Sequence, residues 1–258
     1  MGILVVTWNF PPRKGGIETL MGGLCEGLKK RHRLYVVTSH GPVPAGQEDW
    51  LFRARWPGLW GFAVYAIFRG GLILWRDASI RIVFGGSGAV TPLILLLARI
   101  FRRKAFVQVH GLDLIYANLL YQNLCVRWLK HCDWVVANSR YTASLAVKSK
   151  VKPASVEVIH PGVDWEKFSA SHRRAERKDF SLEGRRVILF VGRLARRKGM
   201  KEFIDRCFDQ IVREVPDVCL VIVGENPTDS MVHRDDVSSE IQALVQGKNL
   251  ASHVRFLG

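Results

Sequence analysis

The chain has 258 residues, which is enough for one large domain or two ordinary domains with a substantial core. Its apolar fraction of 48% is typical of a globular protein, and its net charge of +15 favours anionic partners such as nucleic acid, anionic lipid or phosphorylated substrates. The sequence contains neither an aromatic and basic RNA-binding signature nor a zinc-finger spacing. We therefore expect no nucleic-acid partner and rank a nucleotide phosphate or a membrane surface above it.

The five cysteines form no Cys-x-x-Cys pair, and most of them fall within apolar segments. We expect them to be small buried hydrophobic side chains, and nothing in their spacing indicates an oxidising compartment. The neighbouring His131 does not complete a zinc-ligand spacing, so we expect no metal site. The cysteines are Cys25, Cys125, Cys132, Cys207 and Cys219.

The chain begins directly in a predicted strand, so we expect no signal peptide and a cytoplasmic location. Its longest apolar stretches, Trp56–Trp75 and Ala89–Phe101, are broken by Arg69 and Pro92, which argues against membrane-spanning helices. The basic composition is compatible with peripheral contact at the inner face of a membrane.

The stretch Trp56–Trp75 has two interpretations. The favoured one is a pair of buried helices around Gly70–Gly71, since aromatic and aliphatic residues at helical spacing usually pack in a core. The alternative is a surface that faces a membrane or a lipid acceptor, because tryptophans flanked by arginines suit a membrane interface. These flanking arginines are Arg53, Arg55, Arg69 and Arg76.

Short apolar, β-branched runs alternate with segments of helical period, which predicts an α/β fold with parallel sheets. The predicted strands are Ile3–Trp8, Leu34–Ser39, Arg81–Gly85, Ala105–Val109, Trp134–Ser139, Val156–Ile159, Val187–Val191, Cys219–Val223 and Val254–Leu257. The predicted helices include Ile17–Lys30, Arg140–Ser149, Met200–Glu214 and Val237–Gly247. Residues 169–183 are polar, basic and aperiodic, which indicates a linker between domains at 1–168 and 184–258.

A cationic loop follows the apolar run Val187–Val191, which reads as a strand buried on both faces. Arg193 and Lys198 lie in this loop, directly before a predicted helix. Open α/β sheets bind ligands where strands pass into helices, and a helix N-terminus favours anions. The loop therefore predicts a phosphate or diphosphate site, although a solvated basic loop is the simpler alternative.

Two further loops have features of a site. Gly15 and Gly16 precede a helix whose free N–H groups can approach a ligand, or they serve only to turn the chain. No G-x-G-x-x-G follows the first strand, which argues against a nicotinamide-dependent oxidoreductase. His110 ends an apolar strand; such a histidine is more often structural, yet its position at a carboxyl edge makes it our candidate, with Asp113 a weaker one.

Several short segments, in order, resemble family 4 glycosyltransferases of GT-B architecture. They are the G-R-L-x-x-x-K-G loop with Arg193 and Lys198, the P-P-x-x-G-G-x-E segment with Gly15 and Gly16, the H-G-x-D segment from His110 to Asp113, Asn138–Ser139, the hinge Pro161–Asp164 and the segment Val223–Glu225. The resemblance implies two Rossmann-like, doubly wound parallel-sheet domains, of which the second is incomplete.

The resemblance also implies roles for these residues. Gly15, Gly16, Arg193 and Lys198 would bind the donor diphosphate, and His110 would face the donor sugar as positive charge develops at the anomeric carbon. Further substrate contacts would come from Asp113, Asn138, Ser139, Gly224 and Glu225. We expect no cofactor and no metal, since the chain lacks the D-x-D pair of metal-dependent transferases.

The implied function is transfer of a hexose from a nucleotide-diphosphate sugar to an acceptor hydroxyl with retention of configuration. The expected partners are the nucleotide sugar, a glycan or lipid-linked acceptor as in surface polysaccharide assembly, and an anionic membrane surface. The family's E-x7-E motif does not occur after Arg193. The alternative is therefore a catalytically incomplete remnant that binds a membrane or a partner.

Overall fold

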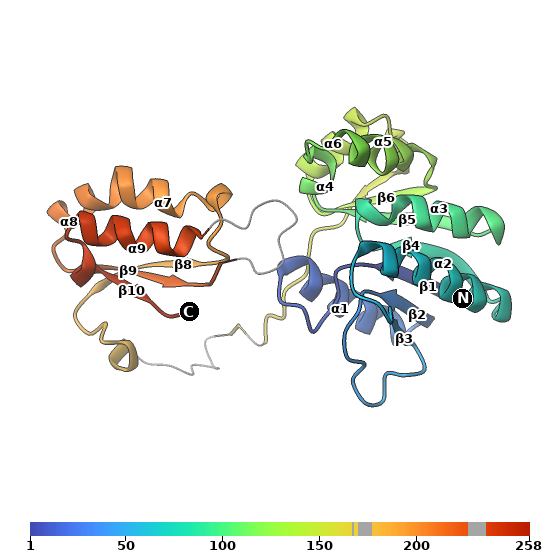
Figure 1. The fold of residues 1–258 in the computed structure, drawn as a ribbon, viewed down its shortest axis with the longest axis horizontal. Helices are drawn as coiled ribbons and strands as arrows, with labels where there is room; N and C mark the ends of the chain where they lie inside the picture. The colour runs from blue at the N-terminus through green and yellow to red at the C-terminus, as the bar shows by residue number, and fades with distance from the viewer. Residues whose placement is uncertain (167, 170–176, 227–235) are drawn as a thin grey trace. The chain divides into compact units, whose positions relative to one another are not determined.

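The computed structural model describes residues 1–166, 168–169, 177–226 and 236–258. The chain divides into two compact units, Met1–Val163 and Asp164–Gly258. Each unit is built on a parallel sheet with helical crossovers (Figure 1), so the predicted α/β class is confirmed. The predicted linker at 169–183 falls partly outside the described residues, and its described end contains one 3₁₀ turn, η5 (Arg177–Phe180).

The first unit contains a seven-stranded sheet with the order β3-β2-β1-β4-β5-β6-β7, in which every pair is parallel. Its strands are short runs of β-branched and aliphatic residues, as expected where helices cover a parallel sheet. They are β1 (Gly2–Thr7), β2 (Arg33–Thr38), β3 (Leu51–Arg53), β4 (Ile80–Gly85), β5 (Lys104–Val109), β6 (Trp134–Ala137) and β7 (Val156–Val158).

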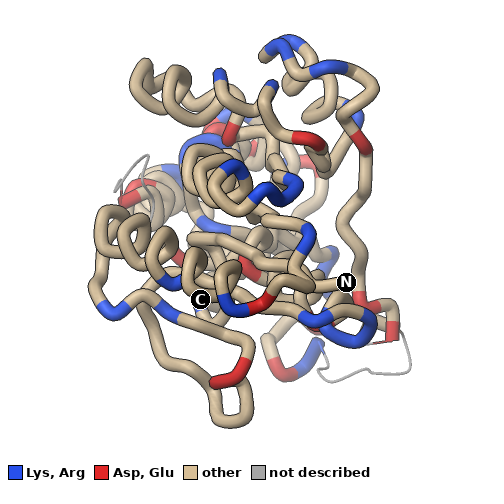
Figure 2. Tube along the Cα trace, turned by 90° about the vertical axis from the view of Figure 1, so that its right-hand side faces the viewer, with Lys and Arg blue, Asp and Glu red and all other residues tan. Residues whose placement is uncertain are grey.

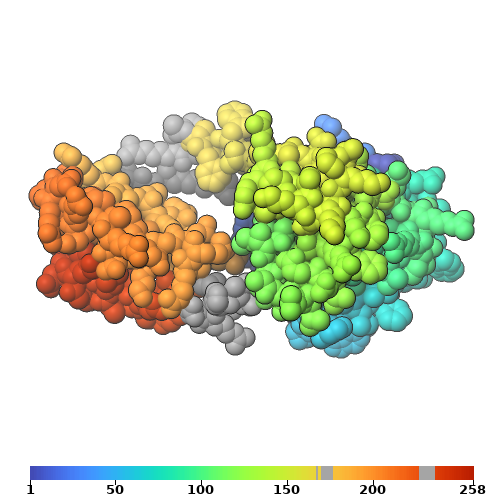
Figure 3. Space-filling view, turned by 90° about the horizontal axis from the view of Figure 1, so that it is seen from above, coloured from blue at the N-terminus to red at the C-terminus, as the bar shows by residue number. Residues whose placement is uncertain are grey.

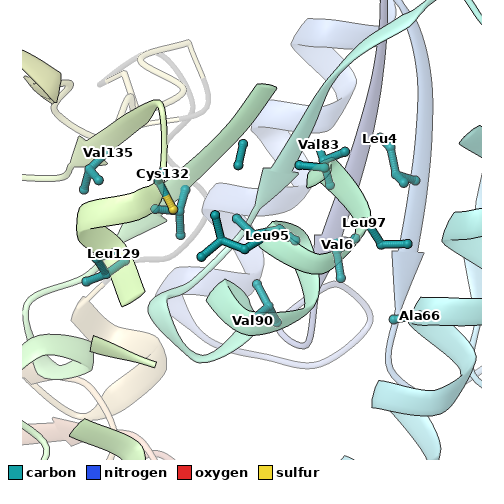
Figure 4. Close-up of a cluster of buried hydrophobic side chains, with 14 of the residues drawn as sticks. Leu4, Val6, Ala66, Val83, Val90, Leu95, Leu97, Leu129, Cys132 and Val135 are labelled. Atoms are coloured by element: carbon teal, nitrogen blue, oxygen red, sulfur yellow. The ribbon is translucent and has the colours of Figure 1, made fainter. Parts of the chain in front are cut away.

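Helices connect these strands and cover both faces of the sheet. They are α1 (Gly16–Lys29), α2 (Leu59–Arg76), α3 (Thr91–Ile100), α4 (Leu112–Ile115), α5 (Leu119–Leu124) and α6 (Arg140–Lys148), with 3₁₀ turns η1 (Gly88–Val90), η2 (Val126–His131) and η3 (Pro153–Ser155). Side chains alternate across β1: Leu4 and Val6 belong to the buried cluster that also contains residues of α2, α3 and η2 (Figure 4), whereas Val5 belongs to the cluster with residues of α1.

The favoured interpretation of Trp56–Trp75 as a pair of buried helices is wrong. It is one helix of 18 residues instead of a buried pair. Gly70 does not break it; a Cβ there would lie 3.0 Å from Leu97, so the glycine lets α3 approach closely. Phe62 is fully buried, but Phe68 is 74% exposed. A pattern of apolar residues alone does not distinguish a core helix from one with an exposed aromatic face.

The second unit contains a three-stranded parallel sheet with the order β10-β9-β8. Its elements are β8 (Arg186–Val191), η6 (Arg196–Lys198), α7 (Met200–Phe203), the π turn η7 (Ile204–Phe208), α8 (Asp209–Glu214), β9 (Val218–Val223), α9 (Val237–Gly247), η8 (Ala251–His253) and β10 (Val254–Phe256). The π turn joins α7 and α8, so the predicted helix Met200–Glu214 is present with one wide turn.

Strand β8 is not buried on both faces as its apolar run predicted. Leu189 and Val191 are 61% and 68% exposed. Ile188 and Phe190 instead face the core built with α7 and α9. Among the described residues, the helices of this unit pack on that one face, so alternate residues of β8 face solvent.

Other elements carry weak sequence signals. The three-residue strand β3 lies in the segment between β2 and α2, and α4, α5 and η2 fill the segment after His110. Within the described ranges, no helix combines the length and the apolarity that crossing a bilayer requires.

The contrast within α2 gives a test of the core. Phe62→Ala should lower the free energy of unfolding by about 3–5 kcal/mol, because it empties a fully buried site beside Trp8. Phe68→Ala, on the exposed face of the same helix, should change it by less than about 0.5 kcal/mol. Urea unfolding followed by circular dichroism measures both, and similar losses for the two variants would contradict this packing.

Candidate active site

Four loops of the first unit meet at the carboxyl edge of its sheet. They follow β1, β4, β5 and β6, whose parallel pairing forces all four to leave the sheet on the same side. Gly15–Gly16, His110, Asp113 and Asn138–Ser139 all belong to these loops or to the helix starts that follow them. The sequence-predicted residues of this unit therefore share one edge.

The loop between β1 and α1 is held by side chains from several elements. The Asn9 amide donates to Oε1 of the buried Glu18 at 2.7 Å, and the Ser39 hydroxyl donates to the Trp8 carbonyl at 2.9 Å. Arg53 donates from Nη2 to the Pro11 carbonyl. Arg53 is buried, so it is not one of the surface arginines that the membrane-facing interpretation of Trp56–Trp75 required. Burial lowers the pKa of its guanidinium. This loop is consequently a fixed platform in front of α1.

Helix α1 begins at this platform with an uncapped N-terminus. Gly15 occupies the N-cap position without a side-chain hydrogen bond, and a Cβ on Gly16 would meet nothing within 4 Å. The first N–H groups of a helix lack intrahelical partners and carry a partial positive charge. The start of α1 is therefore open to an anion at the position that the glycine pair predicted.

His110 is held by the neighbouring strand end. Its Nε2 lies 2.9 Å from the carbonyl oxygen of Gly86, which follows β4. Because a carbonyl oxygen only accepts, Nε2 must carry the proton, and Nδ1 of the neutral ring is then an acceptor. The ring is half-buried, with its orientation fixed by this bond.

Asp113 supports the same turn. Its Oδ2 accepts a hydrogen bond of 2.9 Å from the N–H of Gly88, a buried residue. Burial and the Asp113 charge together raise the pKa of Cys125 to about 11 and raise the pKa of Tyr121 beyond its usual range. Asp113 therefore positions the turn after β4, and its charge adds to the burial that raises the pKa values of Tyr121 and Cys125.

Asn138 and Ser139 are both bonded to Thr142 in the first turn of α6. Ser139 caps the helix by accepting from the Thr142 N–H at 3.1 Å. Asn138 accepts from the Thr142 hydroxyl at 2.7 Å. A Cβ on Gly111 would lie 3.3 Å from that hydroxyl oxygen, so the His110 loop packs against the start of α6.

Sequence reasoning missed Ser87. This residue is 4% exposed, and its hydroxyl has no hydrogen-bond partner in the described structure. It lies between Gly86, which anchors His110, and Gly88, which is bonded to Asp113. The only signal was the turn-rich run Gly85–Gly88 after an apolar strand, which gives no role to the serine.

In the second unit, the ends of β8 and β9 make a close backbone contact. Gly192 donates to the Val223 carbonyl at 3.0 Å, and Leu194 donates to the Glu225 carbonyl at 2.9 Å. A Cβ on Gly224, at a φ of +145°, would lie 2.0 Å from the Gly192 carbonyl oxygen. Only glycine fits there, so the segment around Gly224 and Glu225 fixes the start of the cationic loop.

The cationic loop is partly neutralised by α9. Glu240 accepts from Arg196 and from Lys201, each at 2.6 Å. Arg193 and Lys198, the two cations that the sequence singled out, have exposed side chains. Both precede the N-terminus of α7, so the geometry is suited to an exposed anion such as a phosphate. Among the described residues, no cluster of three or more His, Cys, Asp or Glu could hold a metal ion.

Two parallel α/β units with glycine-rich and cationic loops before their helices define a two-unit, Rossmann-like protein of GT-B architecture. A model described as Glycosyltransferase Family 4 matches residues 14–167, and one described as Glycosyl transferases group 1 matches residues 185–258. The chain belongs to Glycosyltransferase Family 4, and the predicted resemblance is confirmed.

Relatives extend the match over almost the whole chain. A GDP-mannose-dependent alpha-(1-6)-phosphatidylinositol monomannoside mannosyltransferase of Mycolicibacterium smegmatis is 27% identical over 98% of this chain. The chain spans 66% of the length of that relative. A protein of the same name from Mycobacterium tuberculosis is 28% identical over 99% of the chain and 67% of its own length.

The fold is also found in solved structures. HepE of Anabaena, in complex with UDP-glucose, has a TM-score of 0.74 and is 17% identical, covering 100% of this chain and 69% of that one. Sequence identity at this level establishes the similarity of the fold alone.

Asp113 can be tested as a positioning residue. Asp113→Ala should lower the free energy of unfolding by about 1–3 kcal/mol, because it leaves the buried Gly88 N–H without an acceptor. Asp113→Asn keeps an oxygen acceptor and should lose less. Both changes remove a charge that raises the pKa of Cys125, so alkylation of this thiol should begin at lower pH. Unchanged stability and unchanged alkylation would remove Asp113 from this role.

Proposed function

We propose that this protein transfers a sugar from a nucleotide-diphosphate donor to an acceptor hydroxyl, with retention at the anomeric carbon. The observation that carries the proposal is the placement of Arg193 and Lys198, exposed, in the loop between β8 and α7 of a family 4 chain. A departing nucleotide diphosphate concentrates negative charge, and fixed cations lower the energy of the transition state that releases it.

The proposed donor is GDP-mannose, and the proposed acceptor is a glycolipid hydroxyl. The support comes from the relatives that match nearly the whole chain, whose names state both a GDP-mannose donor and a phosphatidylinositol monomannoside acceptor. The transferred sugar would then be a hexose, and a cytoplasmic location with access to lipid-linked acceptors would follow. The chain's charge of +15 suits anionic partners of this kind.

In the proposed mechanism, Arg193 and Lys198 bind the diphosphate, and the N–H groups at Gly15–Gly16 of α1 add donors to it. His110 faces the donor sugar while positive charge develops at the anomeric carbon. Its bond to Gly86 supports this role, because a ring of fixed orientation presents Nδ1 without reorganisation. The cationic loop supplies the charge that a metal ion supplies elsewhere, so we propose a metal-free reaction without a cofactor.

The remaining candidates have supporting roles in this proposal. Asp113 and Asn138 are already bonded to Gly88 and Thr142, which leaves the second oxygen of Asp113 and the amide nitrogen of Asn138 for substrate. Ser139, Gly224 and Glu225 would contact substrate through the loops that they shape.

A binding module without transferase activity is the second candidate. The exposed aromatic face of α2 favours it, because none of the residues assigned to the carboxyl-edge site lies on that face. Donor-dependent transfer of labelled mannose by the purified protein would exclude this alternative.

Removal of each proposed diphosphate ligand should weaken nucleotide binding. Arg193→Ala and Lys198→Ala should each reduce the affinity for GDP by about 1.5–3 kcal/mol, as expected for a charge-assisted contact. Arg197→Ala is the matched control, since it removes an exposed charge from the same loop. Isothermal calorimetry measures the GDP affinity of all three variants, made in the form of the protein that its native cell produces. Wild-type affinity in both test variants, or an equal loss in the control, would exclude these cations as specific ligands.

Substitution of His110 should separate turnover from binding. His110→Ala should lower kcat by roughly 10²-fold while GDP affinity stays within about twofold, since the ring faces the sugar and not the diphosphate. His131→Ala, at the exposed end of η2, is the control. Initial rates and calorimetry give the two quantities. A loss of GDP affinity with kcat retained would reassign His110 to nucleotide binding.

A further inference from the structure

Helix α2 presents an exposed face of large apolar side chains. Trp60 is 85% exposed, Phe68 is 74% exposed and Trp75 is 73% exposed, with Val64 between them at 46%. Spacings of four and seven residues place these side chains along one side of a helix, opposite the buried Phe62. Soluble monomers rarely leave so many aromatic rings on one face without a partner.

Helix α3 continues this face. Leu96 and Ile100 are 43% and 61% exposed, one turn apart on the solvent side of α3. The two helices pack closely, since a Cβ on Gly71 would lie 3.7 Å from the Phe101 ring. We call Trp60, Val64, Phe68, Trp75, Leu96 and Ile100 the apolar outer face.

Cations border the apolar outer face. Residues 51–104 contain nine Lys or Arg, of which Arg53 is buried, and one acidic residue, Asp77, which lies 3.2 Å from Arg33. In Figure 2 the right-hand side of Figure 1, where α2 and α3 lie, faces the viewer, and Lys and Arg are drawn in blue. At the end of α3, Arg99 and Arg102 are exposed. The border is thus almost free of negative charge.

A pocket on the flank of α2 concentrates part of this charge. Three cations, Arg33, Arg69 and Arg76, and one carboxylate, that of Asp77, line a space of about 270 Å³ between α2, β2 and β3. The Arg69 guanidinium stacks over the Phe52 ring at 4.0 Å, and its Nε is buried without a hydrogen-bond partner in the described structure. Such a site suits an anionic group that approaches from the edge of the helix.

We propose that the apolar outer face inserts into the interface of an anionic lipid bilayer, with the arginines of its border against the lipid phosphates. Tryptophan, phenylalanine and leucine at a helix surface bordered by cations are the composition of interfacial membrane helices. Arginine stems can lie along apolar surface while their charges reach the phosphates. This proposal rests on the proposed function, because membrane binding would bring the protein to its glycolipid acceptor. The binding to the bilayer itself requires no sugar donor.

Another exposed apolar segment provides the matched comparison. Leu119 and Leu120 of α5 are 82% and 72% exposed, and the α4–α5 segment lies on the face of the first unit seen in Figure 3. Arg140 and Lys148 of α6 are exposed cations outside the border. Equal changes at these positions therefore control for lost hydrophobicity and lost charge.

The test is co-sedimentation of the full chain with vesicles of phosphatidylcholine alone or mixed with phosphatidylglycerol. We expect binding only to the anionic vesicles, weakened by salt. Phe68→Ser/Trp75→Ser should weaken it by about tenfold or more through lost apolar burial. Arg76→Gln/Arg102→Gln should weaken it by roughly fivefold per charge. Leu119→Ser/Leu120→Ser and Arg140→Gln/Lys148→Gln should bind like the wild type.

Three results would overturn the proposal: no binding of the wild type to anionic vesicles, wild-type binding by both Phe68→Ser/Trp75→Ser and Arg76→Gln/Arg102→Gln, or an equal loss in the controls. Circular dichroism confirms that each variant is folded. GDP affinity and donor-dependent transfer to a water-soluble acceptor are measured on the same proteins. Retained transfer with lost vesicle binding assigns the defect to the membrane face, whereas lost transfer with retained vesicle binding counts against the proposed function alone.

Discussion

Parallel pairing of the strands is the constraint on which the candidate site depends. Each parallel neighbour requires a crossover, so the loops that leave the carboxyl ends collect at one edge of the sheet. Hydrogen bonds then join loops that are distant in sequence: His110 to Gly86, 24 residues apart, and Asp113 to Gly88, 25 residues apart. The site is therefore a property of the sheet's topology, and its loops could not be arranged in this way without it.

Much of this arrangement could be predicted from sequence, because strands covered by helices are nearly continuous apolar runs that end in glycine or polar residues. The strand before His110 is such a run, and the helix after Ser139 begins directly after a serine N-cap. The burial of Arg53 could not be predicted, since its partner is a carbonyl of a loop 42 residues away. Nor could the exposure of α2, because helical spacing is the same for a ring in a core and a ring on a surface.

In the second unit, too, features that depend on neighbouring residues could be predicted from the sequence, whereas contacts between distant residues could not. The cations of its loop are visible in sequence, as is the helix that follows. The pairing of Arg196 with Glu240 joins residues 44 apart, and the contact between Gly192 and Gly224 depends on two strand ends meeting. An exposed ion pair contributes little stability. Its effect is instead to hold the Arg196 guanidinium against α9, on the Glu240 carboxylate that also accepts from Lys201.

The hydrogen bond that holds His110 has a consequence for the edge of the ring that other molecules can meet. The N–H at Nε2 is directed to the Gly86 carbonyl, so Nδ1 is the ring nitrogen left for a second contact. Turning the ring over would break this bond. The protein itself, through the turn after β4, thus selects which edge of this imidazole is presented.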